Sequence, residues 1–483
     1  MEEKAGAQIS IRAFLQSALI LFALMLVAGA LTRIVPSGGY DRVMQDGREL
    51  IDPQSYHPLA RPDYPVWRWF TAPLEVLWGP DSLTVITIII FLLMIGSAFA
   101  VLDKSGLLRT SIGRLVKVFG GRKYQLLLVI SFVFMAMGAF FGIFEEIVPL
   151  VPLMIALSYY LGWDALVGLG MSILATNMGF SAAITNPFTI GVAQKIAALP
   201  LFSGAWLRIL IFIVVYIVFA VFLTRYARRV ERDPQASPVY AEDQAGRAKY
   251  KHWSLENLQG EGAKPGRAML WLLAFVILIL LVLFVGPFVP VLASFALPIV
   301  GLLFFIAGLG AGLLTGAPRR VIFKAAAEGV SGIAPAILLI LMAASIKYIV
   351  AQGGIMDTIL HTASGWFSRT NPFLAALLIY VLALFIEFFI GSGSAKAFLM
   401  MPILLPLADL VGVTRQTAVT AYCFGDGFSN LAYPTNPVLL ICLGLTVVSY
   451  PKWLRWSVGL WAWVILITLV FLGIAVALHY GPF

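Results

Sequence analysis

Apolar stretches long enough to cross a lipid bilayer dominate the pattern of this chain. Several run unbroken for about 20 residues, the length that a membrane-spanning helix needs, at 13–35, 83–102, 206–223, 269–288, 294–314, 333–350 and 457–479. Others are interrupted by Gly, Pro, Asn or charged residues, at 124–162, 165–197, 372–410 and 415–447. The first run is too long for the apolar part of a signal peptide, so we expect it to remain as a span. The pattern predicts an all-α polytopic membrane protein.

Two halves of the sequence resemble each other when each residue is aligned with the one 250 positions later. The segment PLMIALSYYLG (152–162) then aligns with PILLPLADLVG (402–412), and Thr-Asn-Pro at 185–187 aligns with Thr-Asn-Pro at 435–437. Such internal repeats are typical of secondary transporters. We predict a first repeat at 1–226, a cytoplasmic linker with a connecting span at 227–291, and a second repeat at 292–483.

The composition agrees with a membrane protein, because 60% of the residues are hydrophobic and only 12% are charged. The net charge of +9 by itself would suit a nucleic-acid partner. However, most Lys and Arg residues gather near the N-terminus and at 104–123, 225–267, 319–324 and 452–455. Basic loops of membrane proteins stay in the cytoplasm. The charge is therefore a signal of topology, and we expect no nucleic-acid partner.

These basic segments determine the expected path through the membrane. If 124–162 crossed the bilayer once, the basic linker would lie outside, against the positive-inside rule. We therefore predict a re-entrant hairpin at 124–162 that enters from the cytoplasm, and an opposed one at 372–410 that enters from outside. With about nine transmembrane helices they form two inverted repeats, with the N-terminus cytoplasmic and the C-terminus extracytoplasmic. Inverted repeats can expose one central site to each side in turn.

Candidate chemistry lies where the predicted helices are interrupted. Non-helical backbone at membrane depth is tolerated only where it is buried or lines water, as at the hairpin tips and at the Thr-Asn-Pro motifs. An interrupted helix offers N–H groups to an anion and free oxygens to a cation. A capped proline kink is the alternative, but its recurrence after each hairpin favours a binding site. The candidate substrate or ion-binding residues are Glu145, Glu146, Thr176, Asn177, Thr185, Asn186, Ser392, Ser394, Lys396, Asp426, Ser429, Asn430, Thr435 and Asn436.

Glu145 and Glu146 lie side by side at the predicted tip of the first hairpin. A charge at the bilayer centre costs about 2.5–3.5 kcal/mol on insertion scales, so two of them indicate a function. They could hold Na+ together with Asn186, carry a proton, or receive a substrate amine. The alternative is that one glutamate only caps the second arm of the hairpin.

Lys396 takes the place of Glu146 in the second half. It could replace a coupling cation or bind a substrate carboxylate. Equally, it could form a structural ion pair with Glu387, Asp426 or the glutamates of the first tip. By contrast, Lys324, Glu328 and Lys347 lie near the ends of spans, where we expect them only to reach toward the interface.

An enzyme is not expected. The Gly-Ser-Gly-Ser segment at 391–394 has no histidine at membrane depth to activate a serine, and the chain has neither an H-E-x-x-H nor a P-loop motif. Cys423 and Cys442 are too far apart along one apolar segment to form a disulfide. We expect no bound cofactor apart from Na+ or H+ as the coupling ion.

The sequence resembles a known family in four segments: GIFEEIVPLVPLM, GFSAAITNPFTIGVAQ, FFIGSGSAKAFLMMPILLPLADLVGVTRQ and FGDGFSNLAYPTNP. They are similar to the YfcC/DcuC-type carriers, the four-carbon dicarboxylate anaerobic carrier family of bacteria, within the wider ion transporter superfamily. The resemblance covers essentially the whole chain. It implies inverted repeats, opposed hairpins, elevator-like movement and often a homodimer. It also implies that substrate and ion bind at Glu145, Glu146, Thr185, Asn186, Ser392, Ser394, Thr435 and Asn436.

The leading prediction is an ion-coupled secondary transporter in the bacterial inner membrane that moves a small carboxylate-bearing solute. Two glutamates, one lysine and the ends of interrupted helices together suit a zwitterionic or basic amino acid. A dianion would approach both glutamates and be repelled unless they were protonated or bound to a metal. A dicarboxylate carrier or exchanger is the first alternative, and a passive channel or membrane sensor is the second. The expected partners are the small-molecule substrate, the lipid bilayer and a second copy of the chain.

Overall fold

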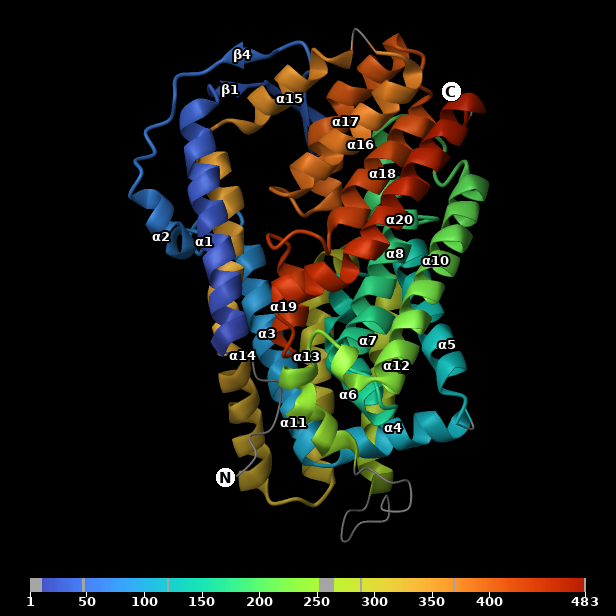
Figure 1. Cartoon of the computed structure of the whole chain (residues 1–483). Helices are drawn as coiled ribbons and strands as arrows, with labels where there is room; N and C mark the ends of the chain where they lie inside the picture. Colours follow the sequence, from blue (N-terminus) through green and yellow to red (C-terminus); the bar gives the residue numbers. More distant parts are fainter. Residues whose placement is uncertain are drawn as a thin grey trace.

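The structure is a computed structural model that describes residues 11–45, 48–119, 121–251, 265–286, 289–367 and 370–481. It is built almost entirely of helices (Figure 1), as the sequence predicts. Within the described residues, ten helices are long and apolar enough to span a membrane. Two of these, Lys123–Phe141 and Gly393–Leu410, are arms of the predicted hairpins, whereas the interrupted stretch at 415–447 is not counted. The expected number of spans, about nine, and the observed number, ten, therefore differ mainly because hairpin arms and interrupted spans are counted differently.

One group of helices packs around α3 (Ser82–Lys104) and α14 (Arg319–Gln352), and we call it the α3–α14 group. Its other members are α1 (Ile11–Ile34), α2 (Arg68–Glu75), α4 (Leu107–Val118), α12 (Pro265–Val285) and α13 (Pro290–Leu314). Glycines allow α3 and α14 to touch through their backbones, because a Cβ at Gly329 would lie 2.2 Å from the carbonyl oxygen of Gly96. Such close packing through small residues is typical of helix pairs in membranes.

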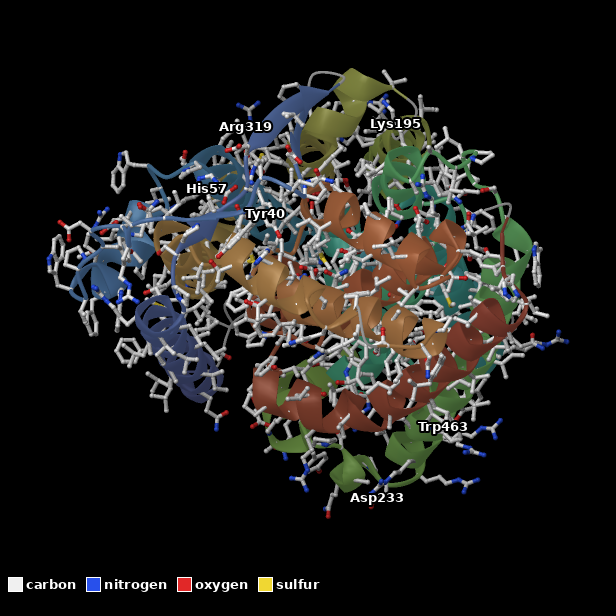
Figure 2. The ribbon with its side chains drawn as sticks, turned by 90° about the horizontal axis from the view of Figure 1, so that it is seen from above. Tyr40, His57, Lys195, Asp233, Arg319 and Trp463 are labelled. Atoms are coloured by element: carbon white, nitrogen blue, oxygen red, sulfur yellow. The ribbon has the colours of Figure 1, made fainter. Side chains whose placement is uncertain are left out.

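Helices from the hairpins, the interrupted stretches and the spans that follow them form a second group, which we call the hairpin group. Its first part comprises α5 (Lys123–Ala136), α6 (Val151–Tyr160), α7 (Ala165–Leu169), α8 (Ala175–Ala182), α9 (Val192–Ile196) and α10 (Ala205–Arg232). Its second part comprises α16 (Pro372–Glu387), α17 (Gly393–Leu410), α18 (Arg415–Ser429), α19 (Pro437–Gly444) and α20 (Tyr450–Ala477). The two parts are packed together, with α18 against α8 and α10 beside α20 (Figures 1 and 2). Cys423 and Cys442 are free and buried in this group.

Short irregular helical turns interrupt the first part of the hairpin group. π-Helical turns occupy Met137–Phe141, Gly170–Leu174 and Pro187–Gly191, and a 3₁₀ turn occupies Glu145–Leu150. π-Turns inside α-helices occur frequently at functional sites. The π-turns at Met137–Phe141 and Pro187–Gly191 adjoin the turn between α5 and α6 and the interruption after α8, the regions that the sequence singles out.

Two helical hairpins approach the middle of the molecule from opposite ends. The pair α5 and α6 lies in the lower half of Figure 1, and the pair α16 and α17 lies in the upper half. The chain reverses near Gly142 in the first pair and near Gly391 in the second. This opposed placement is the one the sequence predicts, while entry of the hairpins into the membrane and the two-repeat division stay predictions.

Short strands cover the upper end of the molecule. β1 (Gly38–Gly39) pairs with β4 (His57–Pro58), and β2 (Arg42–Gln45) pairs with β3 (Arg48–Ile51), both antiparallel. Seen from above, Tyr40 and His57 mark these strands where they cross the helices (Figure 2). Arg42 forms an ion pair of 2.9 Å with Asp357 on α15 (Met356–Ser364). The segment after α1 is thereby tied to the second half of the chain.

At the lower end, part of the predicted linker folds onto the hairpin group. A 3₁₀ turn (Pro234–Ala236) leads into α11 (Tyr240–Lys251), which packs on α6. The buried carboxylate of Asp243 accepts hydrogen bonds from the Tyr159 hydroxyl (2.6 Å) and the Ala165 N–H (2.9 Å). Residues 252–264 of the linker lie outside the described residues.

Candidate functional site

Both Thr-Asn-Pro motifs interrupt a helix in the same way. In the first break (183–186), Asn186 Oδ1 accepts hydrogen bonds from the N–H groups of Phe188 (2.9 Å) and Thr189 (3.3 Å). In the second break (430–436), Asn436 Oδ1 accepts them from Val438 (2.9 Å) and Leu439 (3.4 Å). A proline follows each asparagine, and its missing N–H and fixed φ suit the first position of a helix. The motif is thus a stop followed by a capped restart.

The first break is fastened to the first tip (142–147). The backbone N–H of Thr185 donates to the carbonyl of Ala139 (3.1 Å), and the Thr185 hydroxyl donates to the carbonyl of Phe140 (2.8 Å). Gly142 adopts a φ of +67°, and a Cβ there would lie 2.3 Å from Asn186 Oδ1. Glycine is therefore required twice over, by the backbone conformation and by the close approach of the break.

The second tip (391–396) reaches across to the first half. Ser392 caps α17 by accepting from the Ala395 N–H (3.4 Å), while the Ser394 hydroxyl donates to the carbonyl of Phe188 (2.8 Å). A Cβ on Gly393 would lie 2.8 Å from Thr189 Cγ2 and 3.0 Å from Asp426 Oδ2. The two tips and the two breaks therefore meet in one region, although they come from distant parts of the sequence.

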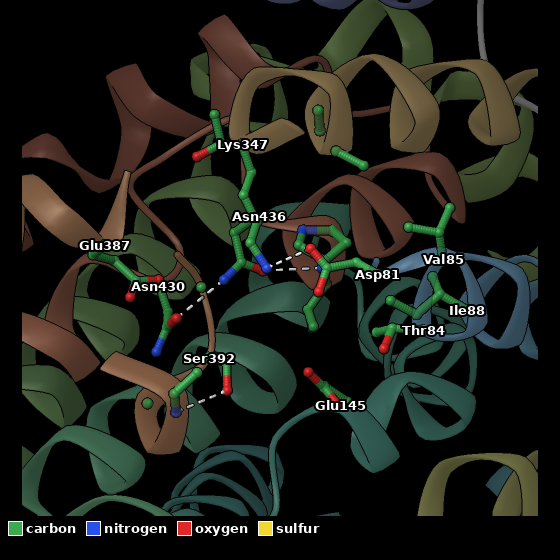
Figure 3. A pocket seen from close by; sticks show the side chains of 18 of the residues that line it. Asp81, Thr84, Val85, Ile88, Glu145, Lys347, Glu387, Ser392, Asn430 and Asn436 are labelled. Carbon is green, nitrogen blue, oxygen red and sulfur yellow. Dashed lines mark hydrogen bonds and ion pairs between the residues drawn. The ribbon is translucent and has the colours of Figure 1, made fainter. Parts of the chain in front are cut away.

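A cavity of about 510 Å³ lies between this region and the α3–α14 group. Its walls are the two tips, the second break, the start of α3 and the upper part of α14 (Figure 3). Glu145 is exposed and points toward the middle of the cavity (Figure 3). This volume lies within the range of about 300–1,000 Å³ that is usual for small-molecule sites.

The cavity carries an excess of negative charge. Among the described residues, neither Glu145 nor Glu146 forms an ion pair with a Lys, Arg or His side chain, and Glu146 accepts one weak hydrogen bond from the Phe144 N–H (3.3 Å). Lys347, the one lysine among the described residues that line the cavity, is paired with Asp81 at 2.6 Å (Figure 3). A cationic group that enters this cavity would therefore meet two carboxylates that have no cationic partner among the described residues.

Lys396 lies behind the cavity wall rather than in it. Its side chain is fully buried, contacts the Glu387 carboxylate, and places Nζ 2.7 Å from Asp426 Oδ1. Of the alternatives left open by the sequence, the structure shows the ion pair, with Glu387 and Asp426 and not with the first tip. Glu387 lines the cavity, so it joins the buried lysine to the cavity surface.

The structure divides the candidate residues between the cavity and its supporting wall. Those that line the cavity are Glu145, Glu146, Ser392, Ser394, Asn430, Thr435 and Asn436. Thr185 is partly exposed and does not line it, and the others are buried behind it, namely Thr176, Asn177, Asn186, Lys396, Asp426 and Ser429. Thr176 and Ser429 donate to carbonyls of their own helices, at 3.0 and 2.7 Å. The amide group of Asn177 is buried and has no hydrogen-bond partner among the described residues.

Sequence reasoning missed the wall that the α3–α14 group contributes. Thr84 on α3, together with Lys347 and Tyr348 on α14, lines the cavity. We expected Lys347 only to reach toward the interface, but its ion pair with Asp81 holds it at the cavity rim. α3 and α14 are not interrupted, so the sequence did not single them out. The one usable signal was a charged residue near an end of each helix, Asp81 before α3 and Lys347 near the end of α14.

No cluster of three or more His, Cys, Asp or Glu side chains in the described part of the chain is arranged to hold a metal ion. The predicted Na+ position near Glu145, Glu146 and Asn186 therefore stays a prediction. Na+ binding by two carboxylates and backbone carbonyls does not require such a cluster.

Comparisons with known proteins place these features in a family context. The chain matches the family described as C4-dicarboxylate anaerobic carrier over residues 14–477. It is 30% identical over 470 residues to the "Putative basic amino acid antiporter YfcC" of Escherichia coli (strain K12), covering 90% of this chain and 91% of that protein. It is 25% identical over 503 residues to an uncharacterized protein of Haemophilus influenzae, covering 95% and 96%. It is also similar to the solved structure of the Alcanivorax borkumensis YdaH transporter, with a TM-score of 0.42, 18% identity, and coverage of 97% and 99%.

Proposed function

The chain belongs to the C4-dicarboxylate anaerobic carrier family and is a multi-pass membrane transporter, and we propose that it carries amino acids with a cationic side chain. The observation that carries this proposal is that Glu145 and Glu146, which line the cavity, have no Lys, Arg or His partner among the described residues. The name of the Escherichia coli relative, a basic amino acid antiporter, points to the same substrate class. Transport is coupled to a gradient of H+ or Na+.

The cavity offers complementary groups for both ends of such a substrate. The cationic side chain would lie at Glu145 and Glu146, where a charge-assisted hydrogen bond is strongest. The substrate carboxylate would lie at the N-termini of α17 and α19, where the positive ends of the helix dipoles favour an anion. Ser392 and Asn436, at these two N-termini, both line the cavity.

We further propose that the hairpin group moves against the α3–α14 group in an elevator-like cycle. The cavity lies at the boundary between the two groups, so relative movement would carry a bound solute while the α3–α14 group stays fixed. The opposed hairpins would close the cavity from the two sides as re-entrant segments of inverted repeats. The N-terminus would be cytoplasmic and the C-terminus outside the bacterial inner membrane, with a homodimer as the assembly.

A dicarboxylate carrier is the alternative that the family description favours. A dianion would meet Glu145 and Glu146 in the cavity, and bringing these like charges together is costly unless protons or metal ions neutralise them. The only lysine of the described residues that lines the cavity is already paired. This charge balance is the reason for preferring a cationic amino acid. A channel or sensor is the second alternative.

The test is solute counterflow in proteoliposomes preloaded with unlabelled lysine, arginine, ornithine, succinate or fumarate. We expect saturable counterflow of labelled lysine or arginine, and its loss in Glu146→Gln. Asp409→Asn is the matched control, because it neutralises a carboxylate in an exposed surface ion pair with Arg415, and such pairs contribute little. Counterflow of succinate alone would establish the dicarboxylate alternative. Unsaturable flux without counterflow would indicate a channel.

A further inference from the structure

Three charged side chains from three helices are buried together behind the cavity. Glu387 ends α16, Lys396 lies in the first turns of α17, and Asp426 lies in α18. Their side chains are between 0% and 1% exposed, and the lysine ammonium group contacts both carboxylates. We call these residues the buried triad.

The charges of the buried triad do not balance. Two carboxylates and one ammonium group leave one unit of negative charge, and no further ion pair joins these residues in the described part of the chain. The titratable side chains that interact with Asp426 are Tyr422 and Cys423 on α18, and both are uncharged in ordinary conditions. The buried guanidinium group of Arg208 on α10 lies near Cys423, but it donates to the Tyr480 hydroxyl and to the carbonyls of Ile184, Phe202 and Ser203 rather than to the triad. An uncompensated charge is expensive in a buried, membrane-embedded place. One additional positive charge is therefore needed.

The packing around the triad leaves room for a proton rather than for a metal ion. The ammonium group already fills the position between the two carboxylates. Gly393 fits only because it has no side chain, since a Cβ there would lie 3.0 Å from Asp426 Oδ2. That oxygen is buried without a hydrogen-bond partner among the described residues. A bound proton would give this carboxyl group, or that of Glu387, an O–H donor.

The triad has one contact with the cavity. Glu387 lines the cavity, whereas Lys396 and Asp426 do not. A Cβ on Gly391, at the second tip, would lie 3.7 Å from Glu387 Oε1, so this carboxylate lies directly under the tip loop. Any exchange of a proton between the triad and water in the cavity would therefore pass through Glu387.

We propose that the buried triad is the proton-coupling site of the transporter, with Lys396 as a permanent, tethered cation in the place where the first half presents Glu146. One proton from water in the cavity binds a carboxylate oxygen of the triad through Glu387, and it returns to water when the cavity faces the other side. No other bond is made or broken. This inference rests on the proposed transport function and specifies its coupling ion as H+ instead of Na+.

The first experiment uses the wild-type protein in proteoliposomes that contain a pH-sensitive dye. A pH gradient should drive accumulation of labelled lysine or arginine and proton movement should accompany it, while replacing Na+ by choline should change neither. Asp426→Asn and Glu387→Gln should lower the number of protons moved per solute, whatever their transport rate. Accumulation that is driven by a Na+ gradient and is indifferent to pH would overturn the inference and leave the proposed function intact. Absence of any amino acid counterflow would instead remove the proposed function.

A second experiment measures ion binding on purified protein and does not require transport. Lys396→Gln leaves two buried carboxylates without their cation, so we expect NaCl, compared with choline chloride, to raise its thermal unfolding midpoint. The wild type should show no such Na+ dependence. Lys452→Gln is the matched control, because it removes a lysine from a partly exposed pair with Glu242. If Na+ raised the unfolding midpoint of the wild type as much as that of Lys396→Gln, the proposed role of Lys396 would be overturned. If Lys396→Gln does not fold, the proteoliposome experiment decides.

Discussion

The hydroxyl group of Ser394 donates a 2.8 Å hydrogen bond to the backbone carbonyl of Phe188. Ser394 belongs to the tip of the second hairpin, and Phe188 follows the first break. The bond therefore joins the two sequence-related halves at the edge of the cavity. Because that carbonyl belongs to the first turn after an interrupted helix, the second tip is held in place directly by the restarted helix of the first half.

Removing this bond should weaken the contact between the halves. We expect Ser394→Ala to lower stability by about 1 kcal/mol, the usual net contribution of a hydrogen bond, and to raise the solute concentration needed for half-maximal counterflow. Thermal unfolding and counterflow measure the two effects. Ser331→Ala is the control, because the Ser331 hydroxyl donates to the Ala327 carbonyl of the same helix, α14 (3.0 Å). If both variants behave alike, the bond between the halves has no special importance.

The two asparagine caps should contribute equally to the stability of the protein, and both should be needed for transport. Asn186→Ala and Asn436→Ala each remove a side chain that accepts two N–H groups, so each should cost about 0.5–2 kcal/mol. Asn371→Ala removes the cap of α16, which accepts from the Leu374 N–H (2.9 Å) away from the cavity. It should cost similar stability but leave the solute affinity unchanged. A comparable loss of affinity in Asn371→Ala would show that the effect is one of general stability.

Gly142 should tolerate no side chain. Gly142→Ala meets Asn186 Oδ1 at 2.3 Å in addition to the unfavourable φ of +67°. Gly412 has a φ of +77° and nothing within 4 Å of a built Cβ, so Gly412→Ala isolates the cost of the backbone conformation, about 1–2 kcal/mol. We expect Gly142→Ala to be clearly the less stable of the two in thermal unfolding. Equal midpoints would mean that the first tip and the first break can separate without cost.

The docking of α11 should weaken as the pH rises. Burial, and then the charge of the neighbouring Asp164, raise the pKa of Asp243 from 3.8 to about 7, while Arg247 on α11 opposes this increase. Because the folded-state pKa is the higher one, the stabilisation is present at low pH and is lost as the pH rises toward the folded pKa. Hydrogen exchange in α11 should therefore be faster at pH 8 than at pH 5, after correction for the intrinsic rate.

Asp243→Asn provides the comparison for this pH effect. The amide cannot ionise, and the Tyr159 hydroxyl that now donates to Asp243 can rotate to accept from it. We expect the difference in α11 protection between pH 5 and pH 8 to be smaller in this variant. An undiminished pH dependence would assign the effect to other groups.

The sequence predicts the local features of the site better than its long-range contacts. Thr-Asn-Pro encodes a stop and a capped restart in neighbouring residues, so both breaks could be predicted from the motif alone. The partner of Lys396 could not, because Glu387, Asp426 and the first tip are distant along the chain and only packing decides among them. Lys347 was misjudged for the same reason, since its partner Asp81 lies on another helix. Local chemistry determines where the helices break, and tertiary packing determines which charges meet.

The burial of Cys423 and Cys442 makes the natural protein suitable for site-directed labelling. Both thiols are free and enclosed in the hairpin group, where a bulky maleimide reagent does not reach them. A cysteine introduced at an exposed position in each helix group would therefore be labelled selectively without first replacing the native ones. Pairs of spin labels or fluorophores placed in this way would measure the distance between the α3–α14 group and the hairpin group in a membrane, with and without solute.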